Sequence, residues 1–193
     1  MHHIYHTEGI ILKSNDYGEA GKYYCIFTRD LGLIYASAQG VRKMSSKLRF
    51  VLQDFSYIKL DLVRGKDFWR LTSASKTSKL DNVAKNTETL KIFANIGRLL
   101  QRLLAGEEAN SELFNDVLQG LFILEKSKTK EELQNIEVVI VLRILNNLGY
   151  IGNDEILQDV IRSPFEEELI FEISKSRTKI LSLINKALGE THL

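Results

Sequence analysis

The densest group of chemically useful side chains lies in residues 40–49, Gly-Val-Arg-Lys-Met-Ser-Ser-Lys-Leu-Arg. Within eight residues this segment carries four cations and two serine hydroxyls, and a glycine opens it. Cations attract a phosphate backbone, serine supplies hydrogen bonds, and glycine lets the main chain approach closely. A solvated basic loop is the alternative explanation of the pattern. The residues that we predict to contact phosphates are Arg42, Lys43, Lys47 and Arg49.

A second cationic segment lies in a later turn, where Arg64, Lys66 and Arg70 are interleaved with Phe68 and Trp69. Aromatic rings beside cations suit unpaired bases, because stacking contributes about 1–3 kcal/mol per base without requiring a sequence. The alternative places Trp69 in the hydrophobic core, and we favour that alternative for this ring. The three cations are expected to extend the phosphate-binding track.

A third set of polar side chains follows helical spacing. Lys91, Asn95, Arg98 and Arg102 lie four, three and four residues apart, which places them on one face of a helix. Such a stripe can receive an acidic peptide or a nucleic-acid backbone, and a solvated helix face is its commoner meaning. The candidate peptide-binding residues are Lys91, Arg98 and Arg102.

The sequence offers little for catalysis or for metal binding. The segment 18–22 places a lysine after a glycine but lacks the spacing and the Ser/Thr of a phosphate-binding P-loop. The single cysteine, Cys25, excludes a disulfide within the chain and every multi-cysteine zinc site, and its strand position predicts an unreactive core thiol. The four histidines lie near the chain ends. We expect a protein that is not an enzyme and has no metal or other cofactor.

The charge distribution separates two halves of the 193-residue chain. Residues 1–80 carry 13 basic and 7 acidic side chains, a net charge of +6, whereas residues 81–193 carry 13 basic and 18 acidic ones, a net charge of −5. A basic half joined to an acidic half favours a polyanion-binding module linked to a second module with a different role. Hydrophobic residues at 44% exclude a disordered chain, and no apolar run is long enough to span a membrane. We expect a cytoplasmic protein.

The elements that position these residues begin with short strands. Turn residues such as Gly32 separate apolar, β-branched and aromatic segments in the first 75 residues. Five short strands at near-regular spacing favour a closed sheet, because closure removes exposed edges, and a five-stranded OB-type barrel fits best. The predicted strands are Gly9–Ser14, Lys22–Thr28, Leu33–Gln39, Phe55–Val63 and Trp69–Ala74.

The remainder of the chain has helical periodicity. A capping box of Thr129 and Glu132 opens a helix whose apolar middle, residues 138–142, predicts a buried central position. Ser163 and Pro164 open a final helix, or two helices broken near residues 174–176. The predicted helices span residues 86–105, 111–126, 129–148 and 164–188. We therefore predict an α+β fold, with an OB-type barrel domain at 1–80 that carries the phosphate-binding candidates and an all-α helical domain at 81–193.

Several short motifs, taken in order, resemble the bacterial recombination mediator RecO. The opening motifs are Glu-Gly-Ile-Ile-Leu-Lys-Ser at 8–14 and Asp-Tyr-Gly-Glu-Ala at 16–20. Ala-Gln-Gly-Val-Arg-Lys at 38–43 and Leu-Gln-Asp-Phe at 52–55 flank the basic segment. Further motifs are Phe-Thr-Arg at 27–29, Thr-Ser-Ala at 72–74, Ser-Glu-Leu-Phe at 111–114 and Leu-Gly-Tyr at 148–150.

This resemblance implies an N-terminal OB domain and a helical domain that act in DNA repair and homologous recombination. It implies binding of single- and double-stranded DNA, annealing of complementary strands, and loading of RecA together with RecR. It also implies docking of the single-strand-binding protein's acidic tail, although residues 139–141 here are Val-Ile-Val where the family often has an arginine-rich stretch. Many members carry a cysteine zinc module after Leu-Gly-Tyr, which this sequence lacks. The alternatives are a protein-interaction adaptor and an RNA-binding OB module.

Overall fold

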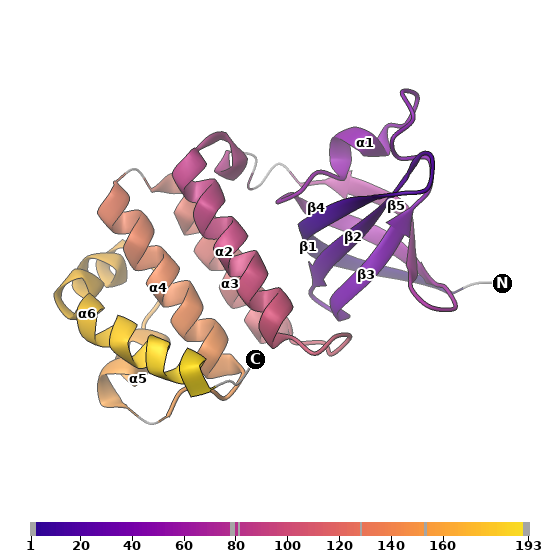
Figure 1. Ribbon diagram of the computed structural model, residues 1–193. Helices are drawn as coiled ribbons and strands as arrows, with labels where there is room; N and C mark the ends of the chain where they lie inside the picture. Colours follow the sequence, from indigo (N-terminus) through magenta and orange to yellow (C-terminus); the bar gives the residue numbers. More distant parts are fainter. Residues whose placement is uncertain (1–2, 78–79, 81, 128, 153, 191–193) are drawn as a thin grey trace.

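The computed structural model describes residues 3–77, 80, 82–127, 129–152 and 154–190 (Figure 1). Strands fill its N-terminal part and helices its C-terminal part. The strands are β1 (Ile4–Tyr17), β2 (Gly21–Thr28), β3 (Gly32–Ala38), β4 (Tyr57–Arg64) and β5 (Trp69–Lys76). The helices are α1 (Leu48–Val51), the 3-10 turn η1 (Val83–Lys85), α2 (Thr87–Leu103), α3 (Ser111–Lys126), α4 (Lys130–Asn147), α5 (Glu155–Arg162) and α6 (Glu167–Glu190).

The five strands close into a barrel in the order β1-β2-β3-β5-β4, which confirms the OB-type prediction. All neighbouring strands are antiparallel except β3 and β5, which pair in parallel through Ala36–Trp69 and Ser37–Arg70. Alternate side chains of each strand fill the interior, as the period of two requires. This interior contains Ile11, Tyr24, Ile26, Ile34, Ala36, Ile58, Leu60, Leu62, Trp69 and Leu71, with Val41 and Leu52 at one end.

The turn between β2 and β3 shows why a glycine is needed at residue 32. Gly32 has a φ of 69°, a conformation that L side chains rarely adopt. A Cβ atom there would lie 2.3 Å from the Glu108 carbonyl oxygen, so the loop between α2 and α3 can pack directly on the turn. The Leu33 amide also donates to the Gly106 carbonyl oxygen at 3.0 Å. The turn therefore joins the barrel to the helical part.

Phe55 was predicted to begin the fourth strand, and this boundary is wrong. Phe55 has a φ of 66° and lies outside β4, which begins at Tyr57. Its ring packs against Phe93 of α2, with the ring centroids 5.0 Å apart. Packing of the side chain onto the helix thus overrides the alternating pattern of the sequence.

The caps of the helices follow the sequence closely. Asn110 accepts a hydrogen bond from the Leu113 amide at the start of α3, and Thr129 and Glu132 form the capping box of α4. α6 begins at Glu167, three residues after Pro164, and runs unbroken through residues 174–176. There the buried Asn135 of α4 donates to Ser174 Oγ and to the Ile170 carbonyl oxygen. α1, η1 and α5 were not predicted.

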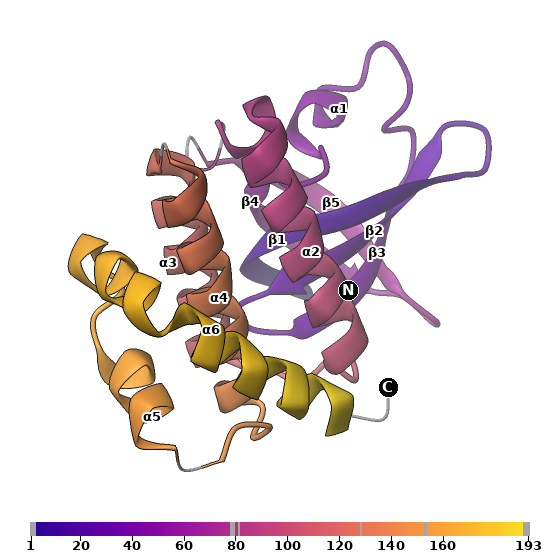
Figure 2. The ribbon, with the colours of Figure 1, turned by 60° about the vertical axis from the view of Figure 1, so that its left-hand side comes forward.

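The barrel and the helices share one hydrophobic core. Ile10, Cys25, Phe27 and Tyr57 face outward from the barrel and pack with residues of α2, α3 and α4. Phe114 of α3 lies at this junction, with its ring centroid 5.3 Å from that of Phe27. Figure 2 shows α2 beside the barrel and α5 on the far side of the helical part. One face of the barrel is therefore covered by helices, and any ligand must use the remaining surface.

Candidate nucleic-acid interface

The basic loop, residues 40–49, connects β3 to β4 and includes the start of α1. Val41 near the start of the loop and Leu52 just after α1 are buried in the barrel interior, which anchors the segment. Gly40, with a φ of 67°, opens the loop, and the Arg42 amide donates to the Ala20 carbonyl oxygen at 2.9 Å. The loop thus lies against the turn between β1 and β2, with its polar residues directed outward.

The cations of the basic loop differ in their surroundings. Lys43 and Lys47 are exposed, and neither forms an ion pair with a carboxylate of the described residues. The Arg42 guanidinium lies 3.3 Å from an Asp16 carboxylate oxygen. Arg49 is half-buried: its Nη1 lies 3.1 Å from Met44 Sδ, and its guanidinium lies 4.7 Å from the centroid of the exposed Phe50 ring. Two lysines are therefore open to a polyanion, and the two arginines are held in defined positions.

The second cationic segment forms the turn between β4 and β5. Lys66 and Arg70 are exposed, whereas Arg64 pairs with Glu107 of the loop between α2 and α3 and lies 4.8 Å from the Trp69 ring centroid. Trp69 is only 4% exposed and fills the barrel, as the favoured core interpretation predicted. Trp69 is therefore not a stacking surface.

A row of aromatic side chains, Tyr17–Tyr23–Phe68, crosses the outer surface of the barrel between the two cationic segments. The ring centroids of Tyr17 and Tyr23 lie 4.5 Å apart, and those of Tyr23 and Phe68 lie 4.9 Å apart. All three rings are partly exposed. Partly exposed rings beside cations are what binding of unpaired bases requires. Of these three residues, sequence reasoning had named only Phe68 as a stacking candidate, because the aromatic row depends on strand pairing.

Tyr57 faces outward from the barrel, but it lies under the helices and is not a free stacking surface. Its ring packs toward Phe114 and Phe122, and its hydroxyl donates to a Glu8 carboxylate oxygen at 2.7 Å. Burial and the neighbouring Glu8 raise the pKa of Tyr57 to about 12. Tyr57 is therefore part of the junction with the helices.

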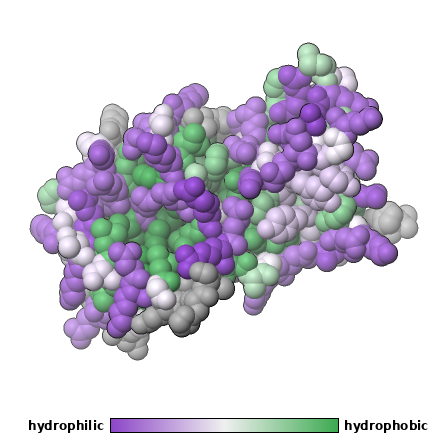
Figure 3. All heavy atoms as spheres, in the orientation of Figure 1, coloured by the Kyte–Doolittle hydropathy of each residue, from purple (hydrophilic) through white to green (hydrophobic). Residues whose placement is uncertain are grey.

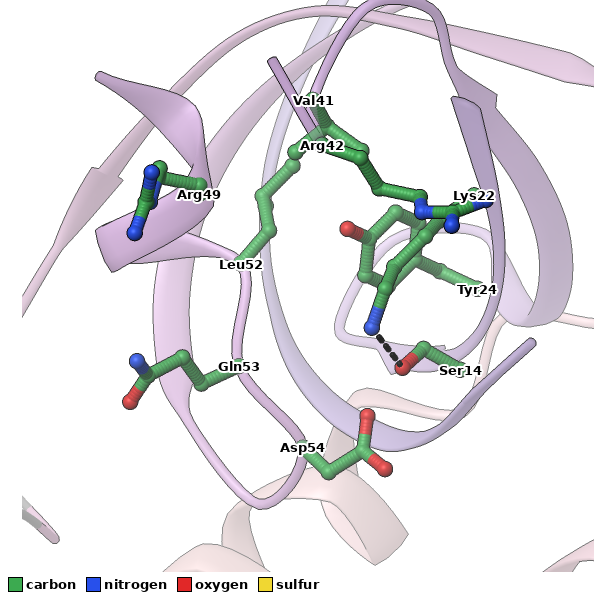
Figure 4. Close-up of a pocket in the computed structure, with 9 residues that line it drawn as sticks. All are labelled: Ser14, Lys22, Tyr24, Val41, Arg42, Arg49, Leu52, Gln53 and Asp54. Carbon is green, nitrogen blue, oxygen red and sulfur yellow. Dashed lines mark hydrogen bonds between the residues drawn. The ribbon is translucent and has the colours of Figure 1, made fainter. Parts of the chain in front are cut away.

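A cavity of about 460 Å³ lies beneath the basic loop at the end of the barrel (Figure 4). Arg42 and Arg49 line it together with Lys22 of β2, so the barrel brings a third cation to the two arginines of the loop. The sequence placed Lys22 in a P-loop-like segment and at the start of a strand, but not among the phosphate contacts. Its inclusion depends on β2 starting beside the loop, which spacing along the chain does not show. The remaining lining residues are Ser14, Tyr24, Val41, Leu52, Gln53 and Asp54.

The helical stripe on α2 is distant from the basic loop in the fold (Figure 1). Lys91 Nζ lies 2.9 Å from a Glu88 carboxylate oxygen, and this ion pair lowers the pKa of Glu88. Arg98 donates to the Asn95 side-chain oxygen at 2.5 Å, and Asn95 in turn donates to Glu137 at 2.8 Å. Arg102 lies in the last turn of the same helix. The stripe is thus linked to acidic and amide neighbours.

The described residues contain few features of a catalytic or metal site. Among them, no three His, Cys, Asp or Glu side chains gather where a metal ion could bind. Cys25 is buried, and burial raises the pKa of its thiol to about 11, which suits the predicted core role. Within the described chain, no helix is both long and apolar enough to cross a membrane.

The hydropathy of the surface varies between the two parts of the molecule. Figure 3 shows hydrophilic side chains over the end of the barrel near α1, and hydrophobic side chains over part of the helical half. The two cationic segments, the aromatic row and the cavity all belong to the barrel and its loops. The barrel surface thus combines cations, which attract phosphates, with aromatic rings, which suit stacking on bases.

Comparison with known families gives one match in this region. Residues 1–79 match the family model described as "Recombination protein O N terminal". The matched segment contains all five strands of the barrel and both cationic segments.

Curated relatives extend the similarity into the helices. A protein of Desulfitobacterium hafniense is 26% identical over 147 residues, covering 76% of this chain and 52% of the relative. A protein of Rubrobacter xylanophilus is 30% identical over 147 residues, covering 76% of this chain and 58% of the relative. Both relatives are called DNA repair protein RecO. The chain spans just over half the length of these relatives.

Proposed function

This chain belongs to the RecO family, and from that membership we propose that its barrel binds single-stranded DNA in DNA repair and recombination. The observation that carries the proposal is the row Tyr17–Tyr23–Phe68 between two cationic segments. The cations neutralise phosphates in any sequence, and the rings stack on bases of any type. The surface therefore suits an extended, unpaired strand bound without sequence preference.

Annealing of complementary strands is a natural consequence of such a surface. Two strands repel each other until their phosphate charge is neutralised, and exposed lysines such as Lys43, Lys47 and Lys66 can provide this neutralisation. Contacts restricted to phosphates and base faces leave the hydrogen-bonding edges of the bases free. We propose that the protein holds strands in this way, and that it binds double-stranded DNA through the same cations.

The partners that we propose belong to the same process. They are RecR, with which the protein would help to load RecA, and the acidic tail of the single-strand-binding protein. The helical half carries a net charge of −5 and would repel DNA, which leaves it available for proteins. The α2 stripe of Lys91, Arg98 and Arg102 remains the predicted surface for an acidic peptide.

A binding titration across salt concentrations tests the proposal. Four to six phosphate contacts give a log–log slope of about −3 to −4 for single-stranded DNA, at roughly 0.7 for each phosphate. Unstructured DNA and RNA oligonucleotides of the same length are compared. Tighter binding to RNA supports the RNA module, and a slope near zero supports the adaptor and contradicts our proposal.

A further inference from the structure

The cavity at the end of the barrel is built from several separate parts of the chain. Ser14 comes from β1, Lys22 and Tyr24 come from β2, and the remaining residues come from the basic loop, α1 and the segment after it. Figure 4 shows these side chains arranged around one space, with Lys22 bonded to Ser14 at its edge. The convergence depends on the closed barrel and is not a property of one loop.

The lining favours an anion. Lys22, Arg42 and Arg49 contribute three positive charges, and Asp54 contributes one negative charge. Ser14 and Gln53 add neutral hydrogen-bond donors, and Lys22 Nζ already lies 3.3 Å from Ser14 Oγ. Arg42 is held by Asp16 outside the lining, at 3.3 Å. A small group with several acceptor oxygens and a negative charge matches this set of donors.

Tyr24 supplies the observation that points most directly to a ligand. Its side chain is 0% exposed, and its hydroxyl has no hydrogen-bond partner in the structure. Buried hydroxyls are normally paired, because an unpaired one loses its bonds to water without replacement. Burial, together with the nearby Asp54 and Asp16, raises the pKa of Tyr24 to about 12, so the group remains a neutral donor at physiological pH. It faces the cavity without a protein acceptor.

We propose that this cavity binds a phosphate group, with the Tyr24 hydroxyl donating to one phosphate oxygen and Lys22, Arg42 and Arg49 neutralising its charge. The inference deepens the proposed function and rests on it for the origin of the phosphate. Two origins share this chemistry: the terminal phosphate of a DNA strand and a phosphodiester within the strand. The volume of about 460 Å³ accommodates either group.

The first experiment measures the binding of inorganic phosphate and the contribution of the Tyr24 hydroxyl to that binding. Thermal unfolding of the wild type and of Tyr24→Phe is followed in rising phosphate at constant ionic strength. A ligand that binds the folded state raises the melting temperature with concentration. We expect phosphate to stabilise the wild type, and Tyr24→Phe to weaken phosphate binding roughly tenfold, because a charge-assisted hydrogen bond is lost. Without phosphate, the variant should be at least as stable as the wild type, because an unpaired buried hydroxyl has been removed.

Two further variants provide a matched control and a second test of the cavity. Tyr35→Phe removes the same atom from the exposed outer face of β3 and should leave phosphate binding unchanged. Lys22→Ala removes a lining cation and should also reduce phosphate binding roughly tenfold, so the proposal remains testable if Tyr24→Phe fails to fold. Equal responses of all four proteins to phosphate would overturn the proposal and leave the Tyr24 hydroxyl a buried group with no role in phosphate binding.

The second experiment separates the two origins of the phosphate. Single-stranded oligonucleotides with a 5′-phosphate, a 3′-phosphate or hydroxyl ends are titrated against wild type and Tyr24→Phe. A roughly tenfold preference for one phosphorylated end, lost in the variant, assigns the terminal group, and an equal loss on all oligonucleotides assigns the phosphodiester. Phosphate binding without DNA binding would contradict the proposed function alone. Normal DNA binding by Tyr24→Phe, with no response to phosphate, would contradict this inference alone.

Discussion

The basic loop and the α2 stripe contain the same kinds of side chain in different surroundings. Lys43 and Lys47 of the loop are exposed, and no carboxylate of the described residues pairs with them. On α2, by contrast, Lys91 is paired with Glu88 at 2.9 Å, and Arg98 is bonded to Asn95. From the sequence, the loop is predicted to bind phosphates, and the stripe to bind an acidic peptide or a nucleic-acid backbone. The local sequence explains the difference, because Glu88 and Asn95 each lie three residues before their partner on α2, whereas no carboxylate lies within the basic loop.

The two halves differ in charge and yet are joined by a common core. Cys25, Phe27 and Tyr57 of the barrel lie in the same cluster as Phe114 of α3. The two cationic segments lie on the barrel side of this junction, and the α2 stripe lies on the helical side. We expect the halves to unfold together and to bind different ligands.

Phe114→Ala tests the common core and should have the largest effect. The side chain is fully buried and packs against Phe27 and Tyr57, so its loss should cost about 3–5 kcal/mol of unfolding free energy. Urea unfolding is followed by the fluorescence of Trp69 in the barrel and by far-UV circular dichroism of the helices. Both transitions should shift together. Phe171→Ala is the control, because this ring on α6 is 72% exposed. Loss of the helices with an unchanged barrel transition would show that the halves are independent.

Alkylation of Cys25 tests the same junction, because burial there raises the pKa of the Cys25 thiol. Burial raises the thiol pKa from 9.0 to about 11, so the reactive thiolate at about pH 8 should be roughly 100-fold scarcer than for an ordinary cysteine. Since the unfolded thiol ionises first, stability should fall as the pH rises from about 9 toward 11. Labelling with iodoacetamide is measured with and without urea. Rapid labelling of the native protein would mean that the junction opens readily.

Phe68→Ala tests the aromatic row and should have a smaller effect. The ring is partly exposed and adjoins Tyr23, and a lost stacking contact should weaken binding of single strands about tenfold. Duplex DNA of the same length should bind as before, because its bases are stacked internally. Phe171→Ala is again the matched aromatic control, since it lies on the acidic half. An equal loss of affinity for single-stranded and duplex DNA would contradict a stacking role for Phe68.

The sequence predicts much of this architecture because local signals agree with the fold. The five strands, the turn at Gly32, the Asn110 cap and the Thr129–Glu132 capping box all depend on residues close together in the chain. The burial of Trp69 and the chemistry of the 40–49 loop also follow from local patterns. α1 was not predicted because a helix of four residues shows no detectable period. The conformation of Phe55 was not predicted because its packing partner, Phe93, lies on α2, far along the chain.

The candidate site is less accessible to sequence reasoning. Seven cations were named as DNA contacts, and the sequence does not reveal that Arg64 pairs with Glu107, since the two are 43 residues apart. Tyr17, Tyr23, Lys22 and Tyr24 join the surface or the cavity only through closure of the barrel. Residue type thus predicts the chemistry of the candidate interface, whereas strand pairing decides which residues lie in it.

The smallest expected change is that of Lys91→Ala combined with Arg98→Ala. Both side chains lie on α2, away from the basic loop, so the loss of both should leave the affinity for DNA unchanged. Binding of an acidic peptide from the tail of the single-strand-binding protein should weaken by a few-fold, because exposed ion pairs contribute about 0.2–1 kcal/mol each. Fluorescence anisotropy of the labelled peptide measures this. Unchanged peptide binding would leave the stripe a solvated helix face.

The central claim is that the basic loop binds the phosphates of a single strand. The measurement compares the salt dependence of single-stranded DNA binding for the wild type, for Arg42→Ala/Lys43→Ala/Lys47→Ala/Arg49→Ala, and for Lys91→Ala/Arg98→Ala. We predict a slope of about −3 to −4 for the wild type and the α2 variant, and a slope shallower by roughly 0.7 per lost contact for the loop variant. Stability should change by under about 0.5 kcal/mol for each exposed cation. A loop variant with the wild-type slope, beside an α2 variant that has lost DNA binding, would contradict the account.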